Sequence, residues 1–145
     1  MKQFLSVLCL STLLLPGLSS CTKMDKNDNA YKVMGAWTPE RYELRYTDFN
    51  GDSVVYEATS FGKDIWEFRK RGKLLIHLGT PDAGPYSYKY SVNDAVLDIG
   101  NQKYTITQLD NNHLKYYHIS PPNDTARIQG QALGIVYYQE WHFSK

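Results

Sequence analysis

Short runs in which apolar and polar residues alternate recur along most of the chain, and this period of two constrains the fold more than any other feature. Residues 42–47 and 86–92 both alternate aromatic or aliphatic side chains with polar ones. Side chains of a strand point to opposite faces in turn, so the pattern indicates strands with one buried face. Turn-forming residues separate the runs, as at Asn50-Gly51 and Arg71-Gly72. After the first 20 residues, no segment has the three-and-four spacing of an amphipathic helix. The chain is therefore predicted to be all-β, an antiparallel barrel or sandwich of short strands.

The first 20 residues differ from the rest. Lys2 precedes an apolar run over residues 4–15, which is shorter than the roughly 20 residues that a membrane-spanning helix needs. Its length is typical of the apolar region of a secretory signal. The tetrad that follows, Leu18-Ser19-Ser20-Cys21, resembles the lipobox of bacterial lipoproteins, in which an aliphatic and two small residues precede an acylated cysteine. The resemblance implies a signal peptide over residues 1–20, cleavage before Cys21 and lipidation of its thiol. The alternative is an ordinary signal peptide with a chance cysteine at its end.

Cleavage there divides the chain into a leader, a tether and one domain. Residues 21–30 are polar and aperiodic and are predicted to form a flexible tether, and residues 31–145 a single β domain. The implied partner is a membrane, reached through the lipid anchor. Thr22 follows the lipidated cysteine, which by analogy with known sorting signals favours the outer membrane of the cell envelope. The other cysteine, Cys9, would leave with the leader, so the mature chain would contain no disulfide.

The residues show no pattern of catalysis or of nucleic-acid binding. Without Lys2, 15 basic residues balance 15 acidic ones, whereas nucleic-acid binding normally shows a basic excess. The four histidines lie in separate segments, and a zinc site needs three or four convergent ligands. Glu140 and His142 share one face of the last predicted strand, and they are interpreted as outward-facing and solvated. There is no Gly-x-Ser-x-Gly motif and no phosphate-binding glycine loop. We expect a protein that is not an enzyme and has no cofactor or metal.

A glycine and a tryptophan at the start of the domain favour the barrel over the sandwich. Gly35-Ala36-Trp37 resembles the Gly-x-Trp motif of lipocalin and calycin barrels, in which the tryptophan fills the closed end. The rest of the chain resembles the lipocalin-like domains of small Gram-negative lipoproteins, with a Trp-x-Phe strand at Trp66 and Phe68. The resemblance implies an antiparallel, up-and-down, lipocalin-like barrel of about eight strands. It lacks one feature of the family, because no late arginine is placed to cover Trp37.

Aromatic residues supply the candidate ligand site. Many fall at alternating positions and are predicted to share the inward face, and an eight-stranded barrel can be filled by side chains or hold one small ligand. We expect a small, partly apolar ligand to contact some of them. The candidate ligand-binding residues are Trp66, Phe68, Tyr88, Tyr116, Tyr137 and Trp141. The alternative is a filled barrel that acts as an interaction or structural module towards a protein partner in the envelope.

Two further surface features are candidates for chemistry. The basic run Arg69-Lys70-Arg71-Gly72-Lys73 is interpreted as a solvated hairpin tip, with a phosphate or anionic-lipid contact as the alternative. Ser53 and Thr125 each follow an aspartate and precede an aliphatic residue, which resembles an O-glycosylation acceptor of some Gram-negative envelopes. Both fall beside predicted turns, where a glycan would extend into solvent.

Overall fold

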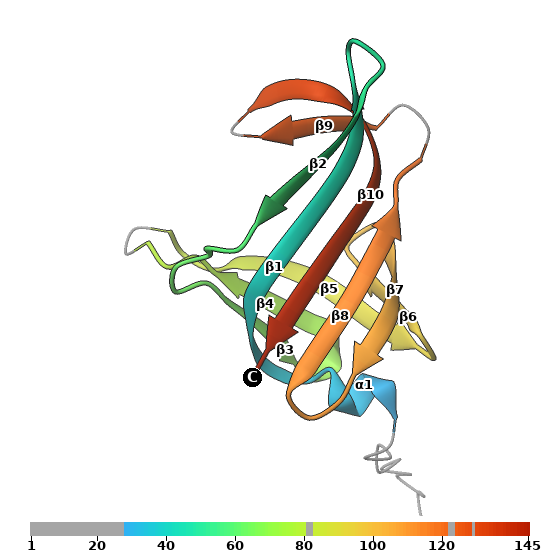
Figure 1. Ribbon diagram of the computed structural model, residues 1–145. Coiled ribbons are helices and arrows are strands. Elements are labelled where there is room, and N and C mark those ends of the chain that lie inside the picture. The colour runs from blue at the N-terminus through green and yellow to red at the C-terminus, as the bar shows by residue number, and fades with distance from the viewer. Residues whose placement is uncertain (1–27, 81–82, 122–123, 129) are drawn as a thin grey trace, which may run out of the picture.

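A computed structural model describes residues 28–80, 83–121, 124–128 and 130–145, and these residues are mainly strands (Figure 1). The elements in chain order are α1 (Asn29–Lys32), β1 (Gly35–Asp48), β2 (Ser53–Ala58), β3 (Ile65–Arg69), a 3-10 turn (Lys70–Gly72), β4 (Lys73–His77), β5 (Tyr86–Asn93), β6 (Val96–Ile99), β7 (Gln102–Leu109), β8 (His113–Ile119), β9 (Thr125–Ile128) and β10 (Gln131–Ser144). The helix of the described part is too short to cross a membrane.

Eight of the strands form a closed barrel. Their order is β1-β3-β4-β5-β6-β7-β8-β10, and β10 pairs with β1 to close the ring. All pairs are antiparallel, and most join strands that are consecutive in the sequence. The predicted antiparallel barrel of about eight strands is therefore confirmed.

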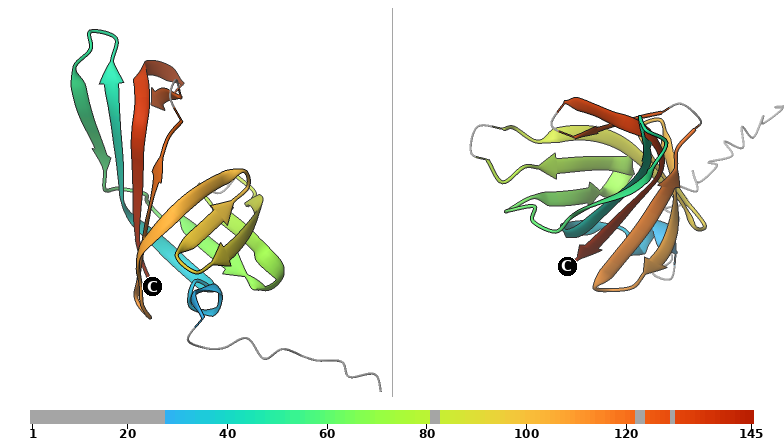
Figure 2. Two further views of the ribbon diagram at one scale, coloured as in Figure 1. Left: turned by 90° about the vertical axis from the view of Figure 1, so that its right-hand side faces the viewer. Right: turned by 45° about the horizontal axis from the view of Figure 1, so that its top comes forward.

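The remaining two strands extend the barrel on one side. β1 and β10 are each 14 residues long, and the halves that lie beyond the barrel pair with β2 and β9. The four strands rise together from the barrel rim, as the left view of Figure 2 shows. This extension has its own small core, formed by Leu44, Tyr46, Ala126 and Val136. The apolar residues of the alternating run 42–47 therefore face the core of the extension and not the interior of the barrel.

Bulges in the β1–β10 pair change which residues face inward. Trp141 pairs with Tyr42 and Tyr138 with Arg45, but Tyr46 pairs with Val136, so Tyr137 is the extra residue. A bulge of this kind shifts the alternation by one position. Val136 consequently points into the extension core, whereas the Tyr137 ring is 39% exposed. The prediction that Tyr137 faces inward is wrong, because a strict period of two was carried through the bulge.

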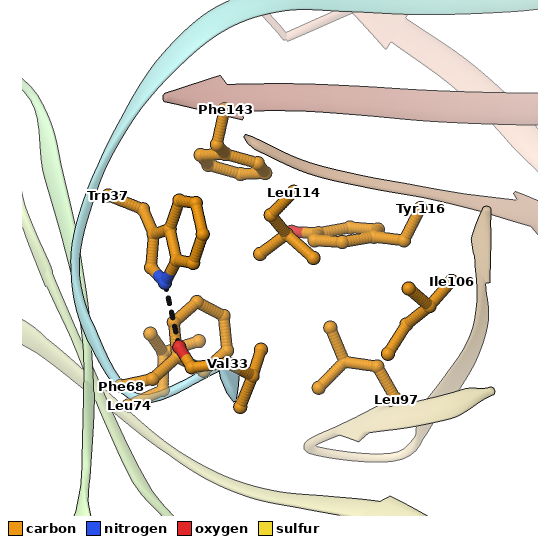
Figure 3. Packing of buried hydrophobic residues seen from close by; sticks show 9 residues of the cluster. All are labelled: Val33, Trp37, Phe68, Leu74, Leu97, Ile106, Leu114, Tyr116 and Phe143. Carbon is orange, nitrogen blue, oxygen red and sulfur yellow. Dashed lines mark hydrogen bonds between the residues drawn. The ribbon is translucent and has the colours of Figure 1, made fainter. Parts of the chain in front are cut away.

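A tightly packed core fills one end of the barrel, which we call the closed end. Trp37 and Phe143 are fully buried there beside Phe68, Leu114 and other residues of the cluster (Figure 3). The Trp37 Nε1–H donates to the carbonyl of Val33 at 2.7 Å. Trp37 therefore occupies the position that its motif implied. No late arginine was predicted to cover Trp37. A lysine lies over the ring instead, with Lys145 Nζ 4.1 Å from its centre.

The helix α1 lies across the closed end (Figure 1). Asp28 caps it by accepting a hydrogen bond from the Ala30 amide, and the Asn29 side chain donates to the Asp94 carbonyl at 2.7 Å. The predicted tether over 21–30 was therefore drawn too long, since a four-residue helix leaves no periodic signal in the sequence. The predicted leader over 1–20, and Cys21, lie outside the described residues.

Candidate ligand-binding site

The barrel end opposite α1 is hollowed into a cavity of about 480 Å³, which we call the mouth cup. β7 starts at the cup and ends at the closed end, so the two features lie at opposite ends of the barrel. The residues that line the cup are Trp66, Ile76, Tyr88, Ile99, Gly100, Asn101, Gln102 and Tyr104. Its floor rests on the barrel core, against which Trp66, Ile76, Ile99 and Tyr104 pack.

Strand register explains why these side chains meet. Trp66 pairs with Trp37 on one side and with Ile76 on the other, and paired residues of an antiparallel sheet point to the same face. Because Trp37 is in the core, Trp66 and Ile76 also face inward. On the opposite wall Tyr104 pairs with Leu97, which is fully buried. The cup is thus the upper layer of the same inward-facing set that packs the core below.

An aromatic cluster extends from the cup along β1 and β10. The Trp141 ring lies between those of Tyr42 and Trp66, at centroid distances of 4.3 and 5.1 Å, and Phe61 is 5.7 Å away. Burial raises the pKa of Tyr42 to about 12 and that of Tyr104 in the same direction. Both phenols therefore stay neutral at physiological pH, and no charged residue is among the described residues that line the cup.

A few polar groups lie at or beside the cup. The Tyr104 hydroxyl donates to Gln102 Oε1 at 2.7 Å, and Asn101 stands at the rim. Next to Tyr104, His118 Nδ1 lies 2.7 Å from the Lys103 carbonyl, which can only accept, so Nδ1 carries the proton. His118 Nε2 is buried without a partner among the described residues. Hydrogen-bonding capacity is therefore present around an apolar cavity.

The six candidate ligand-binding residues separate into three groups. Trp66 and Tyr88 line the mouth cup, and Trp141 packs directly behind Trp66. Phe68 and Tyr116 are fully buried in the barrel core, and Tyr137 lies on the outer face of the extension, where its hydroxyl is 2.9 Å from Ser53 Oγ. Tyr88 is 43% exposed, as expected of a residue at an open rim.

Sequence reasoning missed several residues of the cup. Ile76 of β4 and Ile99 of β6 were not among the candidate residues, because aliphatic residues give no signal that separates a cavity wall from a packed core. Gly100 and Asn101 are predicted to form a turn, and they do, whereas Gln102 is the first residue of β7. Their place at the rim follows only from the closure of the barrel.

Charged residues form a compact network on the outer face of β1 and β10. Glu43 is buried between two arginines, with Arg41 Nη2 2.6 Å from its carboxylate and Arg45 on the other side. Glu140 lies directly opposite Glu43 and accepts hydrogen bonds from Tyr138 and His142. The prediction that Glu140 and His142 are solvated is wrong, since their side chains are largely covered. Burial alone would raise the pKa of Glu140, but these two hydrogen bonds hold it below its ordinary value. These hydrogen bonds run within each strand, and the contact that crosses between the two strands is the Arg45 guanidinium, 4.7 Å from the centre of the Tyr138 ring.

The closed end carries a second, more polar depression of about 540 Å³, which we call the closed-end groove. Its charged lining residues are Lys32, Glu67, Arg69, Lys70 and Lys145. It is slightly larger than the mouth cup, but its charges make it unsuited to an apolar molecule.

The glycosylation candidates both lie on the extension. Ser53 is the first residue of β2 and Thr125 the first of β9, and both are exposed. Each therefore begins an edge strand, and both side chains are exposed to solvent, where a modification would be accommodated.

Comparisons with known proteins add no assignment, since no family model, no curated protein and no solved structure matches the chain. Within the described ranges, no three His, Cys, Asp or Glu side chains converge in a way that could hold a metal ion.

Proposed function

We propose that this protein is a lipid-anchored protein of the cell envelope that binds a small, uncharged, partly apolar molecule in the mouth cup without catalysing a reaction. The observation that carries the proposal is the cup itself, an uncharged cavity with three aromatic rings at the open end of a barrel. Cavities of about 300–1,000 Å³ with mainly apolar walls and a few polar groups are typical of small-molecule sites.

The lining defines the chemistry of the ligand. Trp66, Tyr88 and Tyr104 present ring faces and edges, which favour a flat or aliphatic apolar surface. Asn101 and Gln102 offer amides at the rim for hydroxyl or carbonyl groups of the ligand. A charged ligand would lose its hydration without gaining a counter-ion, because no charged residue is among the described lining residues.

The anchor rests on the lipobox resemblance at Cys21, and the fold is compatible with it. The chain enters the barrel at α1, across the closed end, so a tether from Cys21 would leave the mouth cup directed away from the membrane. Two or three acyl chains, each buried methylene contributing about 0.8 kcal/mol, anchor a protein firmly. The outer membrane remains the expected location.

Binding of an uncharged aromatic probe, N-phenyl-1-naphthylamine, tests the proposal. We expect the wild type to bind the probe and Tyr88→Ala to weaken binding by about tenfold, as for loss of a good aromatic contact. Tyr31→Ala is the matched control, because Tyr31 is 40% exposed and lies at the closed end. A wild type that binds no probe, or equal losses in the two variants, would contradict the proposal.

A second candidate function is a protein-interaction module that acts through the outer face of the extension. Large apolar side chains are exposed there, namely Val55, Ile135 and Tyr137, and Ile119 is exposed at the adjoining end of β8. The outer edges of β2 and β9 end the sheet, and free edges can pair with a partner strand. This function would be favoured if the cup bound no probe and Val55→Lys abolished an in-cell cross-link between the extension and an envelope protein.

A further inference from the structure

We infer that the closed end of the barrel docks on anionic phospholipid headgroups of the membrane that holds the lipid anchor. The inference concerns a surface remote from the mouth cup, and it rests on the anchoring part of the proposed function. It gives the barrel a fixed orientation, with the closed end on the bilayer and the mouth cup facing outward.

The first observation is the charge of the β3–β4 loop. Four of the five residues from Arg69 to Lys73 are basic, and the loop is at the closed end because Arg69 and Lys70 line the groove beside Lys32. Arg69 is engaged with Glu67 at 2.8 Å. The other three cations, Lys70, Arg71 and Lys73, are exposed and form no ion pair among the residues that the structure describes.

The second observation is the backbone at Arg71. Its φ of 63° is left-handed, as is that of the following Gly72 at 69°. Glycine and asparagine are the ordinary residues in this conformation, and a long side chain there is uncommon. The tip of this turn therefore carries a positively charged arginine at a position where the backbone conformation favours glycine or asparagine.

The third observation is how the acidic groups at this end are held. Asp28 accepts the Ala30 amide in the cap of α1, and Asp110 accepts the amides of Asn112 and His113. These two carboxylates are engaged with the backbone of their own turns, and Glu67 is paired with Arg69. Asp94 of the β5–β6 turn also lies at this end, but among the described residues no acid pairs with Lys70, Arg71 or Lys73. The loop cations are therefore free to meet an external anion.

The fourth observation is the distance from the anchor. Asn29 is eight positions after Cys21, and a fully extended chain spans at most about 3.6 Å per residue. The closed end therefore lies within roughly 29 Å of the lipidated cysteine. A basic surface held this close to an anionic leaflet has a high local concentration of its partner, and its contacts strengthen as it approaches within a Debye length of about 8–10 Å.

Headgroup quenching in reconstituted vesicles tests the docking. The full chain is expressed in its envelope, extracted, and reconstituted in phosphatidylcholine vesicles with or without phosphatidylglycerol, both carrying a headgroup nitroxide quencher. A fluorophore is placed at Asn111→Cys, in the closed-end groove, or at Asn101→Cys, at the mouth cup. Both asparagines stand in β-hairpin turns, which makes the two positions comparable.

We expect strong quenching at position 111 in the anionic vesicles, several-fold more than at 101, and its loss at high salt or without the anionic lipid. The variant Lys70→Gln/Arg71→Gln/Lys73→Gln should lower the ratio of docked to undocked protein by about 100-fold, since each cation near such a surface contributes roughly a factor of five. Equal quenching at the two positions, or no effect of the triple variant, would overturn the inference.

A control variant separates a local surface from net charge. Lys63→Gln/Lys103→Gln/Arg127→Gln removes the same charges away from the closed-end groove, and it should leave quenching at 111 unchanged. If it reduces quenching equally, attraction is general and the closed end is not a docking surface. The mass of the extracted protein reports the anchor separately. Protein without acyl chains that stays off the vesicles contradicts the anchor, whereas acylated protein without position-specific quenching contradicts the docking alone.

Discussion

Replacing Trp37 should destabilise the protein far more than replacing an aromatic residue of the mouth cup. Trp37 is fully buried, and its indole N–H satisfies the Val33 carbonyl. Truncation of a buried tryptophan to alanine costs about 3–5 kcal/mol, and the loss of this hydrogen bond places Trp37→Ala toward the upper end. Tyr88→Ala should cost about 1 kcal/mol, because the side chain is 43% exposed and lines an open cavity.

Chemical and thermal unfolding of the two variants measures this contrast. For a domain of this size, 1 kcal/mol corresponds to roughly 4 °C in Tm, so we expect a fall of about 12–20 °C for Trp37→Ala and about 4 °C for Tyr88→Ala. Since the whole domain is stabilised by only about 5–15 kcal/mol, Trp37→Phe provides a milder variant, with an expected loss of about 2 kcal/mol.

Equal losses for Trp37→Ala and Tyr88→Ala would refute the reasoning, because they would mean that the Tyr88 ring packs as tightly as the core. A loss below about 0.5 kcal/mol for Trp37→Phe would show that neither the indole hydrogen bond nor its volume contributes. In either case the division of the barrel into a filled closed end and an open cup would be wrong.

Three further predictions concern the anchor, the surface and acid stability. Cys21→Ala should abolish acylation and release the protein from the membrane, which metabolic labelling with a fatty-acid analogue and fractionation would measure; a labelled, membrane-bound variant would contradict the anchor. If Ser53 or Thr125 is glycosylated, the intact mass of protein from its native envelope should exceed the mature mass and fall in Ser53→Ala or Thr125→Ala, whereas an unmodified mass would end the hypothesis. Hydrogen bonds from the backbone amide of Asn112, from Gln108 and from His113 hold the pKa of Asp110 well below its ordinary range. A depressed pKa stabilises the fold above the unfolded value near about 4, and this stabilisation is lost as the pH falls further. The free energy of unfolding of Asp110→Asn should therefore fall less steeply below about pH 4 than that of the wild type. The same slope in both proteins would contradict a lowered pKa of Asp110 in the folded state.

The fold was predictable because its period of two survives along most strands. Tyr42, Leu44 and Tyr46 do share a buried face, and Trp37 fills the closed end as its motif implied. Turn residues between the runs marked the hairpins, since most barrel strands pair with their neighbours in sequence. Alternation and turn chemistry are local properties, and an antiparallel barrel of consecutive strands depends mainly on local properties.

The parts that failed depend on non-local geometry. The bulge at Tyr137 adds one residue to β10, and nothing in the local sequence distinguishes a bulged tyrosine from a regular one. For the same reason the partial burial of His142 could not be foreseen, since Arg41 of β1 lies opposite it only once the sheet has closed.

The site was predictable in part. Trp66 and Tyr88 line the cup, yet Phe68 lies two residues from Trp66 on the same face and is part of the core. The two differ only in depth along the barrel axis. Depth is set by strand tilt and register, which alternation does not encode.

Native mass spectrometry of the protein purified from its own envelope tests the central claim, that the mouth cup holds a small molecule, most directly. Ile99→Trp should fill the cup, because Ile99 lines it, whereas Ile65→Trp adds the same bulk to an exposed position at the start of β3. We predict a one-to-one complex with an uncharged molecule for the wild type and for Ile65→Trp, and bare protein for Ile99→Trp. Bare protein in all three, or a complex that persists in Ile99→Trp, would contradict the claim.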